Sequence, residues 1–590
     1  MLLKSLIDYY DTLVDLKKVP PFDMSRSNVG FAIDLNRDGS VKRVVTLQET
    51  VEGTNRVIGK QLFVPLQENR SSGKAPYFLT DKMQYVLGCK YEKHGTEMVR
   101  GIFSDYFQAF RNLHHEVLAG CDSEKARTVL RFIDGIIPGS YPPILDENLE
   151  KMDAKGTQPQ IILRDENGQN MFEDPGIHGA WDAYLQKKIA NAEEMFDLVD
   201  GKRSPIKELH GTVRGIGKTA GGISLISYNK NAFESYGREH GENSPVSYVN
   251  EHKYVSALNY LFSLFDYVIK IGDPASPSMY ITYWASNGNS SYQDIFSDEY
   301  NGTEIMDKDD LRYIVNHLVK GESVPFKEST LRPDEKFYVL GVSANAARMS
   351  VQLFYENSFG NIIQNVYDHE QRLMIEGSKD DRVISAKRIL NETVRQINGK
   401  KLESNPSPSI TLGLYKAIMQ NTRYPAAIFS QVMARINADH GIRYAKAQIV
   451  KAYLIKNGNN VPKEVLSVSL NKESNYEPYV LGRIFAVLEK IQKDSSPTIN
   501  TTIKDRYIAR AASDPVVVFP GLLKLSQNHQ RKLSGSSRIY YSNLLNDLMG
   551  KLSEQFPKHL TLEEQGSFYL GYYQENQELY RKKSENKEEK

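Results

Sequence analysis

Cysteine is scarce in this sequence of 590 residues, with only Cys89 and Cys121. Two cysteines provide neither a disulfide framework nor a cysteine-ligated zinc site. No stretch approaches the ~18 uncharged apolar residues that a membrane-spanning helix needs. The N-terminal apolar run contains Asp8 and Asp11, which argues against a signal peptide or a membrane anchor there. We therefore expect a cytoplasmic protein without a membrane partner.

Net charge is also nearly absent, because 74 Lys and Arg are balanced by 73 Asp and Glu. Proteins that bind free nucleic acid through bulk electrostatics are usually strongly basic. Any nucleic-acid contact must therefore use local basic patches, or partner subunits must supply most of the positive charge. Tryptophan is rare, with 2 residues, whereas 35 tyrosines supply flat amphipathic surface, most of it expected in packing.

Three catalytic motifs are approached but not completed. A P-loop ending at Lys218-Thr219 requires glycine at position 212, where the chain has threonine. Gly215 and Gly217 half-match a dinucleotide fingerprint but lack the βαβ context. Ser343 resembles a nucleophile-elbow serine, although Asn345 replaces the final glycine. No metal-ligand spacing is evident, so the sequence predicts no catalytic residue, no metal and no cofactor.

The spacing of apolar residues predicts an α+β protein of several domains. A mixed N-terminal domain with short antiparallel sheets and helices is expected over residues 1–375, followed by an all-helical C-terminal bundle over 376–590. The expected helices are 2–16, a pair within 97–135, 248–264 and 307–320. The expected strands are a hairpin over 29–47 with Gly39 in its turn, then 159–163, 267–271, 279–284, 337–342 and 349–354.

The segment from His210 to Val246 combines a glycine-rich loop with a β-branched run and then interleaved aromatic and amide residues. Glycine allows backbone N–H groups to approach a phosphate, and Arg214 or Lys218 would supply positive charge. Aromatic faces beside amides suit nucleic-acid bases. The alternative is a surface hairpin whose glycines only make turns.

A second candidate lies in YFLTDKMQYVLGC, residues 77–89, where a polar centre separates two apolar arms. Such a pattern indicates a loop held by strands, with Asp81, Lys82 and Gln84 at its tip. Lys and Gln can pair with purine edges, and Asp can accept from a cytosine amine. The alternative is an ordinary exposed hairpin turn.

Long segments across the chain resemble the large subunit of type I-C CRISPR interference complexes (Cascade). They are GGISLISYNKNAFESYGREHGENSPVS at 221–247, LRPDEKFYVLGVSANAARMSV at 331–351, NTRYPAAIF at 421–429, TIKDRYIARAASDPVVVFPGLLKL at 502–525 and GSFYLGYYQENQELYRKK at 566–583. The resemblance implies a non-catalytic subunit that reads the short PAM flanking the target in double-stranded DNA and helps to open the duplex, while the guide RNA reads the sequence. It also implies Cascade backbone and guide-end subunits and a separate helicase-nuclease as partners.

The resemblance carries site roles onto particular residues of this chain. PAM contacts are implied for Thr80, Asp81, Lys82 and Gln84. Backbone gripping and strand separation beside the PAM are assigned to Arg214, Lys218, Thr219, Gly221, Gly222, Asn229 and Asn231.

The C-terminal region resembles the helical bundle that this family also makes separately as a small subunit. About the last 120 residues form this bundle, with an internal translation start expected between about residues 461 and 479. Contacts with a DNA strand's backbone are expected from Lys504, Arg506, Arg510, Arg531 and Lys532. Two rival interpretations stay open: a nucleotide-dependent enzyme using the glycine-rich loop 215–222, and a structural scaffold without DNA contacts.

Overall fold

The protein divides into two compact units, which are described separately. Unit 1 comprises Met1–Phe265 with Ala344–Ser350, and unit 2 comprises Asp266–Ser343 with Val351–Lys590. The structure is a computed structural model that describes residues 1–50, 57–68, 70, 74–94, 97–153, 159–217, 221–228, 230–273, 276–301, 308–327, 329–345, 348–377, 383–397, 401–402 and 404–588.

Unit 1 combines short strands with amphipathic helices. Its strands are β1 (Met24–Leu35), β2 (Val41–Thr46), β3 (Gln48–Thr50), β4 (Val57–Pro65), β5 (Thr80–Lys82), β6 (Cys89–His94), β7 (Glu97–Ile102), β8 (Gln160–Arg164), β9 (Glu194–Phe196) and β10 (Arg203–Pro205). Its helices are α1 (Leu2–Asp15), α2 (Met83–Val86), α3 (Ser104–Leu118), α4 (Glu124–Gly135), α5 (Pro143–Asp153), α6 (Pro175–Ala190) and α7 (Tyr248–Ser263).

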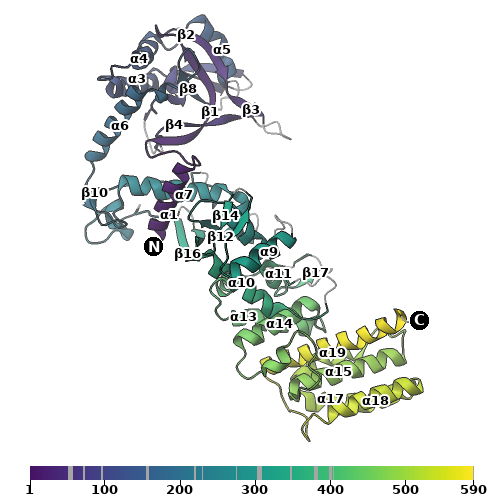
Figure 1. The fold of residues 1–590 in the computed structure, drawn as a ribbon. Helices are drawn as coiled ribbons and strands as arrows, with labels where there is room; N and C mark the ends of the chain where they lie inside the picture. The colour runs from purple at the N-terminus through teal and green to yellow at the C-terminus, as the bar shows by residue number, and fades with distance from the viewer. Residues whose placement is uncertain are drawn as a thin grey trace. The chain divides into compact units, whose positions relative to one another are not determined.

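The main sheet of unit 1 is organised around the long strand β1 and has the order β3-β4-β1-β8-β5 (Figure 1). The first half of β1 pairs antiparallel with β4, its second half pairs antiparallel with β2, and β8 runs parallel along its other edge. Phe31, Ile33 and Leu35 alternate onto one face, where they pack in a core with residues of α3 to α6. Ala32 lies in a smaller cluster with Val64 and Ile162.

Unit 2 starts with a small antiparallel sheet and continues as helices. Its strands are β11 (Val268–Asp273), β12 (Ser276–Ala285), β13 (Val324–Phe326), β14 (Ser329–Leu331), β15 (Lys336–Asn345), β16 (Arg348–Ser358), β17 (Gln396–Ile397) and β18 (Lys401–Leu402). Its helices are α8 (Ser291–Asn301), α9 (Lys308–Val319), α10 (Phe359–Leu373), α11 (Ala386–Asn391), α12 (Pro408–Met419), α13 (Ala426–Ala438), α14 (Tyr444–Asn457), α15 (Glu477–Ser495), α16 (Ile503–Ser513), α17 (Pro515–Gln530), α18 (Gly535–Met549) and α19 (Leu562–Glu588).

Helices α15 and α19 form the centre of the C-terminal bundle and lie side by side (Figure 1). They approach closely at two glycines. A Cβ on Gly482 would lie 1.9 Å from the carbonyl oxygen of Phe568, and one on Gly571 would lie 2.1 Å from that of Tyr479. Beside this contact, Arg483 and Glu575 form a buried ion pair of 2.8 Å. The same apolar core extends to the sheet strands β11, β12 and β15, so this compact unit begins before residue 375.

The expected fold class is confirmed: short sheets with helices in the N-terminal region, then a mostly helical C-terminal region. The hairpin turn at Gly39 forms as expected, with a φ of +88° at that glycine. Two details differ. Residues 97–102 form strand β7 before the expected helical pair. The β-branched run at 223–228 does not form a strand: Ile223 pairs with Val213 and Ser224 pairs with Arg348, each as a single bridge. No described helix is long and apolar enough to cross a membrane.

Candidate functional site

The segment around residues 77–86 is a short edge strand followed by one helical turn. β5 pairs antiparallel with β8, with Thr80 opposite Ile162 and Lys82 opposite Gln160, and α2 begins at the next residue. The expected loop between two strands is therefore an edge strand whose polar residues have different surroundings.

Asp81 lies in the interior, fully excluded from solvent. Its carboxylate accepts hydrogen bonds from the Arg70 guanidinium at 2.5 Å and from the backbone N–H groups of Tyr77 and Lys82, both at 2.7 Å. Burial raises the pKa of Asp81, and the hydrogen bond from Arg70 opposes this rise. The Arg70 guanidinium also lies over the rings of Tyr77 and Tyr85, at 3.7 and 4.1 Å from their centroids. Asp81 therefore holds the segment in place from beneath.

The other polar side chains of this segment differ in their access to solvent. Thr80 is fully buried, and its hydroxyl has no hydrogen-bond partner among the described residues. Lys82 is exposed and Gln84 is half-buried. Of the four expected PAM contacts, only Lys82 and Gln84 present side chains that another molecule can reach.

The glycine-rich loop is the tip of a very short hairpin. Val213 and Ile223 exchange two backbone hydrogen bonds of 2.8 and 2.9 Å. Gly215, Gly217 and Gly222 adopt left-handed φ values of +84°, +73° and +84°, which side chains with a Cβ rarely adopt. A Cβ on Gly222 would also lie 2.7 Å from the Val213 carbonyl oxygen. Glycine is required here for the backbone to turn.

The structure places the expected gripping residues unevenly. Arg214 is exposed on the ascending side of the loop, and Gly221 is exposed on its return. Gly222 is buried, and Asn231 is exposed at the start of a single 3₁₀ turn, Asn231–Phe233. Lys218, Thr219 and Asn229 lie outside the described residues.

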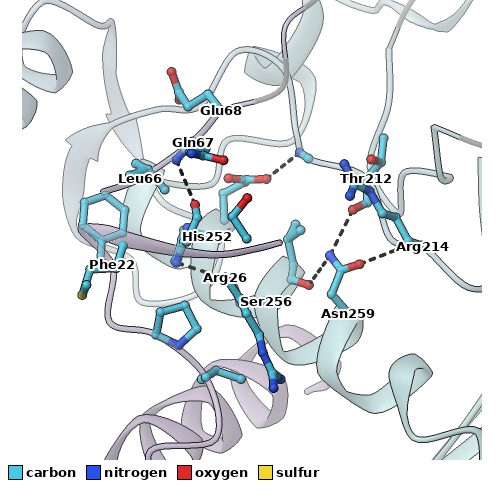
Figure 2. Close-up of a pocket in the computed structure, with 18 of the residues that line it drawn as sticks. Phe22, Arg26, Leu66, Gln67, Glu68, Thr212, Arg214, His252, Ser256 and Asn259 are labelled. Atoms are coloured by element: carbon cyan, nitrogen blue, oxygen red, sulfur yellow. Dashed lines mark hydrogen bonds between the residues drawn. The ribbon is translucent and has the colours of Figure 1, made fainter. Parts of the chain in front are cut away.

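A cavity of about 1280 Å³ in unit 1 brings the two candidate segments together. Lys82 from the end of β5 and Arg214 from the glycine-rich loop both line it. Its other walls include Arg26 on β1 and the cavity-facing residues of α7, as Figure 2 shows. Aromatic rings line the cavity as well, at Phe22, Tyr77, Tyr248, Tyr260 and Phe265.

The cavity wall is cationic although the whole chain is nearly neutral. Seven Lys and Arg line it against three Glu. One of these acids, Glu68, forms ion pairs with Lys188 at 2.6 Å and with Lys207. Burial opposes ionisation of Glu68, but the two lysines outweigh it and hold its pKa at about 2. Arg26, Lys82 and Arg214, by contrast, form no side-chain ion pair or hydrogen bond with another described residue. These three cations are available to an anionic ligand.

Two buried histidines beneath the cavity are uncharged near neutral pH, whereas a buried glutamate beside them remains largely ionised. Burial lowers the pKa of His210 to about 4 and that of His252 to about 4, with a further lowering by nearby Lys207. Burial raises the pKa of Glu251 to about 6, although a hydrogen bond from the Gly211 N–H opposes the rise. The positive potential of the cavity therefore comes from the exposed lysines and arginines. Exposed cations with flat rings beside them suit a polyanion that carries planar groups.

The expected strand-contacting residues of unit 2 lie on one helix of the C-terminal bundle and in the turn after the next helix. Lys504, Arg506 and Arg510 are on α16, and Arg531 and Lys532 follow the end of α17. Arg510 forms an i,i+4 ion pair of 3.0 Å with Asp514. Arg506, Arg531 and Lys532 are exposed.

One group of described residues has the composition of a metal site. Ligand atoms of Asp23, His178 and Asp182 lie within 4.8 Å of one another. His178 Nε2 already lies 2.5 Å from an Asp23 carboxylate oxygen, and Asp182 is exposed. The arrangement is explained by that ion pair. No spacing in the sequence marks this group, because Asp23 is far from His178 and Asp182 along the chain and meets them only through folding.

Sequence reasoning also missed Arg26, Arg70 and Asn259. Arg26 lies before the hairpin expected over 29–47, and Arg70 lies in a polar stretch that suggests only a loop. Asn259 lies between Leu258 and Tyr260 in the expected helix 248–264, and a polar residue with apolar neighbours there is the signal that could have identified it.

Comparison with known proteins identifies a family over nearly the whole chain. The family model described as CRISPR-associated protein (Cas_Csd1) matches residues 6–580. A search of curated protein sequences found no significant match.

Proposed function

The chain belongs to this family of CRISPR-associated proteins, and we propose that it is the large subunit of a type I-C RNA-guided surveillance complex. In this role it recognises the PAM in double-stranded DNA, helps to unwind the duplex and start the R-loop, and helps to recruit a helicase-nuclease for antiviral defence. The subunit itself is non-catalytic. The observation that carries the proposal is the meeting of Lys82 and Arg214 on one cationic cavity of unit 1.

Within that cavity we assign different tasks to the two segments. Lys82, which lines the cavity, and Gln84, two residues further along the chain, read base edges, because their side chains are accessible and both can pair with purines. Thr80 and Asp81 contribute by holding the strand from the interior. Arg214 contacts a phosphate, because a guanidinium matches phosphate oxygens and this one has no described ion-pair partner.

The remaining loop residues support strand separation beside the PAM. Gly221 and Gly222 let the backbone turn close to the DNA, and Asn231 offers an exposed amide. The same task is proposed for Lys218, Thr219 and Asn229 on the evidence of the sequence alone.

The C-terminal helices contact the backbone of a DNA strand through Lys504, Arg506, Arg510, Arg531 and Lys532. Support comes from the exposure of Arg506, Arg531 and Lys532. We also propose that the C-terminal part of the gene yields a separate small subunit, starting between about residues 461 and 479. Helix α15 begins at Glu477, so a product that starts before this residue retains the complete set α15 to α19.

We divide the function at the boundary expected from the sequence, where mixed strands and helices give way to helices: residues 1–375 recognise the PAM, and residues 376–590 support a DNA strand. The remaining partners are the guide RNA and the Cascade backbone and guide-end subunits, in a cytoplasmic complex. A complex that supplies its own guide-binding subunits also explains why this chain needs no large net charge.

The proposal is tested by binding the assembled complex to a duplex library with randomised PAM positions. Lys82→Ala and Gln84→Ala should each change the preferred PAM and weaken binding to the preferred one by about 1–3 kcal/mol. Lys60→Ala is the matched control, because Lys60 is exposed on β4 and does not line the cavity. Equal binding to all flanking sequences by the unaltered complex would remove the proposal.

Two rival functions are separated by simple measurements. A nucleotide-dependent enzyme would turn over ATP with magnesium when the pure chain is assayed. Against it, the described residues after the glycine-rich loop form bridges to Val213 and Arg348 where a P-loop requires a helix. A scaffold without DNA contacts would show unchanged DNA affinity for Lys82→Ala, Gln84→Ala and Arg214→Ala alike.

A further inference from the structure

The backbone on either side of Val213 is held from two directions. Val213 directs its own N–H and C=O toward Ile223, with which it exchanges two hydrogen bonds. The flanking groups, the Thr212 C=O and the Arg214 N–H, face the opposite way, as alternate peptide groups do along an extended strand. In a sheet those two groups would pair with a further strand.

Here the side chain of one residue takes the place of that strand. Asn259 on α7 donates from Nδ2 to the Thr212 carbonyl oxygen at 3.0 Å and accepts at Oδ1 from the Arg214 N–H at 2.9 Å (Figure 2). Its second Nδ2 hydrogen bonds the Val255 carbonyl oxygen of its own helix at 3.1 Å. A planar amide has its donor and acceptor arranged like a backbone peptide group, so it satisfies both neighbours at once.

The neighbouring residues leave this segment little freedom to move. Val213 and Ile216 are buried in the core. Gly215 packs so closely on α7 that an added Cβ would lie 3.2 Å from the Phe262 carbonyl oxygen. Two turns before Asn259 on α7, Glu251 accepts a hydrogen bond from the Gly211 N–H at 2.6 Å. Within 211–216, the Arg214 side chain is the one that extends, exposed, to the cavity.

We propose that Asn259 is a positioning residue that fixes the backbone at Arg214 and so sets where the guanidinium meets a DNA phosphate. The positioning itself is a property of the free protein, whereas its consequence for DNA rests on the proposed function. The pairing needs both ends of the amide. Asn259→Asp keeps the acceptor for the Arg214 N–H but turns a carboxylate toward two carbonyl oxygens, and Asn259→Ala removes all three hydrogen bonds.

Hydrogen exchange at the backbone amides of residues 211–217 in the full-length protein tests the positioning directly. Asn259→Ala should accelerate exchange of the Arg214 amide by about tenfold or more, because this N–H loses its acceptor. Asn148→Ala is the matched control, since among the described residues the Asn148 amide bonds the Ile144 carbonyl of its own helix and nothing else. It should leave the exchange of residues 211–217 unchanged. Unchanged exchange at Arg214 in Asn259→Ala would overturn the inference.

A double-mutant cycle with the assembled complex tests the consequence. Arg214→Ala and Asn259→Ala should each weaken target binding by about three- to tenfold, and the double variant should bind like Arg214→Ala alone, because Asn259 acts through Arg214. If the double variant loses affinity by the product of the two single losses, Asn259 acts independently of Arg214 and the inference is overturned. If Arg214→Ala binds like the unaltered complex while exchange at Arg214 still responds to Asn259→Ala, the positioning stands and the DNA role of Arg214 fails.

Discussion

The imidazole of His114 on α3 accepts a hydrogen bond at Nε2 from the backbone N–H of Leu79, over 2.9 Å. Its Nδ1–H donates to the Phe110 carbonyl oxygen at 2.7 Å, which fixes the neutral tautomer. Leu79 has a left-handed φ of +56° and directly precedes β5. One buried histidine thus holds the entry to the strand that carries Lys82 to the cavity.

The first prediction concerns acid stability. Burial lowers the pKa of His114 from 6.5 to about 3, so below pH 6.5 the unfolded chain binds a proton that the native protein does not. The stabilisation is complete above pH 6.5 and is lost as the pH falls toward 3. When the pH falls from 7 to 5, proton uptake by this histidine in the unfolded chain should lower the free energy of unfolding by about 2 kcal/mol. His114→Gln should reduce that loss, as measured by urea unfolding at the two pH values.

The adjacent His115 provides the control for this measurement. Its side chain is exposed, whereas that of His114 is fully buried, so His115→Gln should leave the loss of stability between pH 7 and pH 5 nearly unchanged. Equal losses in the His114→Gln and unaltered proteins would show that His114 does not set the acid sensitivity.

The second prediction concerns the buried pair of Asp81 and Arg70. Asp81→Ala leaves the guanidinium and two backbone N–H groups without their acceptor, and should lower the free energy of unfolding by about 3–5 kcal/mol. Chemical denaturation measures this. Lys82→Ala, at the exposed neighbouring position, should change it by less than about 0.5 kcal/mol. A direct base contact by Asp81 would instead change PAM preference without loss of stability.

The third prediction separates phosphate from base contacts. Arg214→Ala should weaken binding to all PAM sequences alike and reduce the slope of log affinity against log salt by about one. Fluorescence binding assays over a range of salt concentrations measure both. Arg238→Ala is the control, because Arg238 is exposed in the same sequence segment, 210–246, but does not line the cavity. A changed PAM preference in Arg214→Ala would reassign this residue to base reading.

The fourth prediction tests the packing of α15 against α19. Gly482→Ala places a methyl group where the Phe568 carbonyl oxygen lies 1.9 Å away, so the helices must separate. We expect a loss of about 3 kcal/mol or more in unfolding free energy. Gly521→Ala on α17 is the matched control, since its added Cβ meets no atom within 4 Å. It should stabilise the protein by up to about 1 kcal/mol, because alanine favours helix.

The fifth prediction concerns the separate small subunit. Expression from the native gene should yield a second, shorter product that reacts with an antibody against the C-terminus, starting between about residues 461 and 479. A western blot that shows only the full-length chain would remove this prediction. Circular dichroism of the purified product should show a folded helical bundle, because α15 packs most extensively on α19.

Periodicity predicted most of the elements because it is a local property. The expected helix 248–264 is α7, at Tyr248–Ser263, and the expected strand 159–163 is β8, at Gln160–Arg164. Periodicity did not predict which polar residues at the centre of 77–89 are buried. Asp81 and Lys82 are adjacent and both charged, yet one is fully buried and the other exposed. The burial of Asp81 is tolerable because Arg70 compensates its charge and two backbone N–H groups donate to its carboxylate.

The sequence by itself determined the class of fold, the order of its helices and strands, and the resemblance to a CRISPR-associated family. It also marked the two segments that carry the candidate site. The tertiary structure alone decided that Lys82 and Arg214 line one cavity, and that Asn259 holds the backbone beside Arg214. The physical reason is range. Apolar spacing acts over one or two turns of chain, whereas burial, charge compensation and the satisfaction of backbone groups depend on residues that only folding brings together.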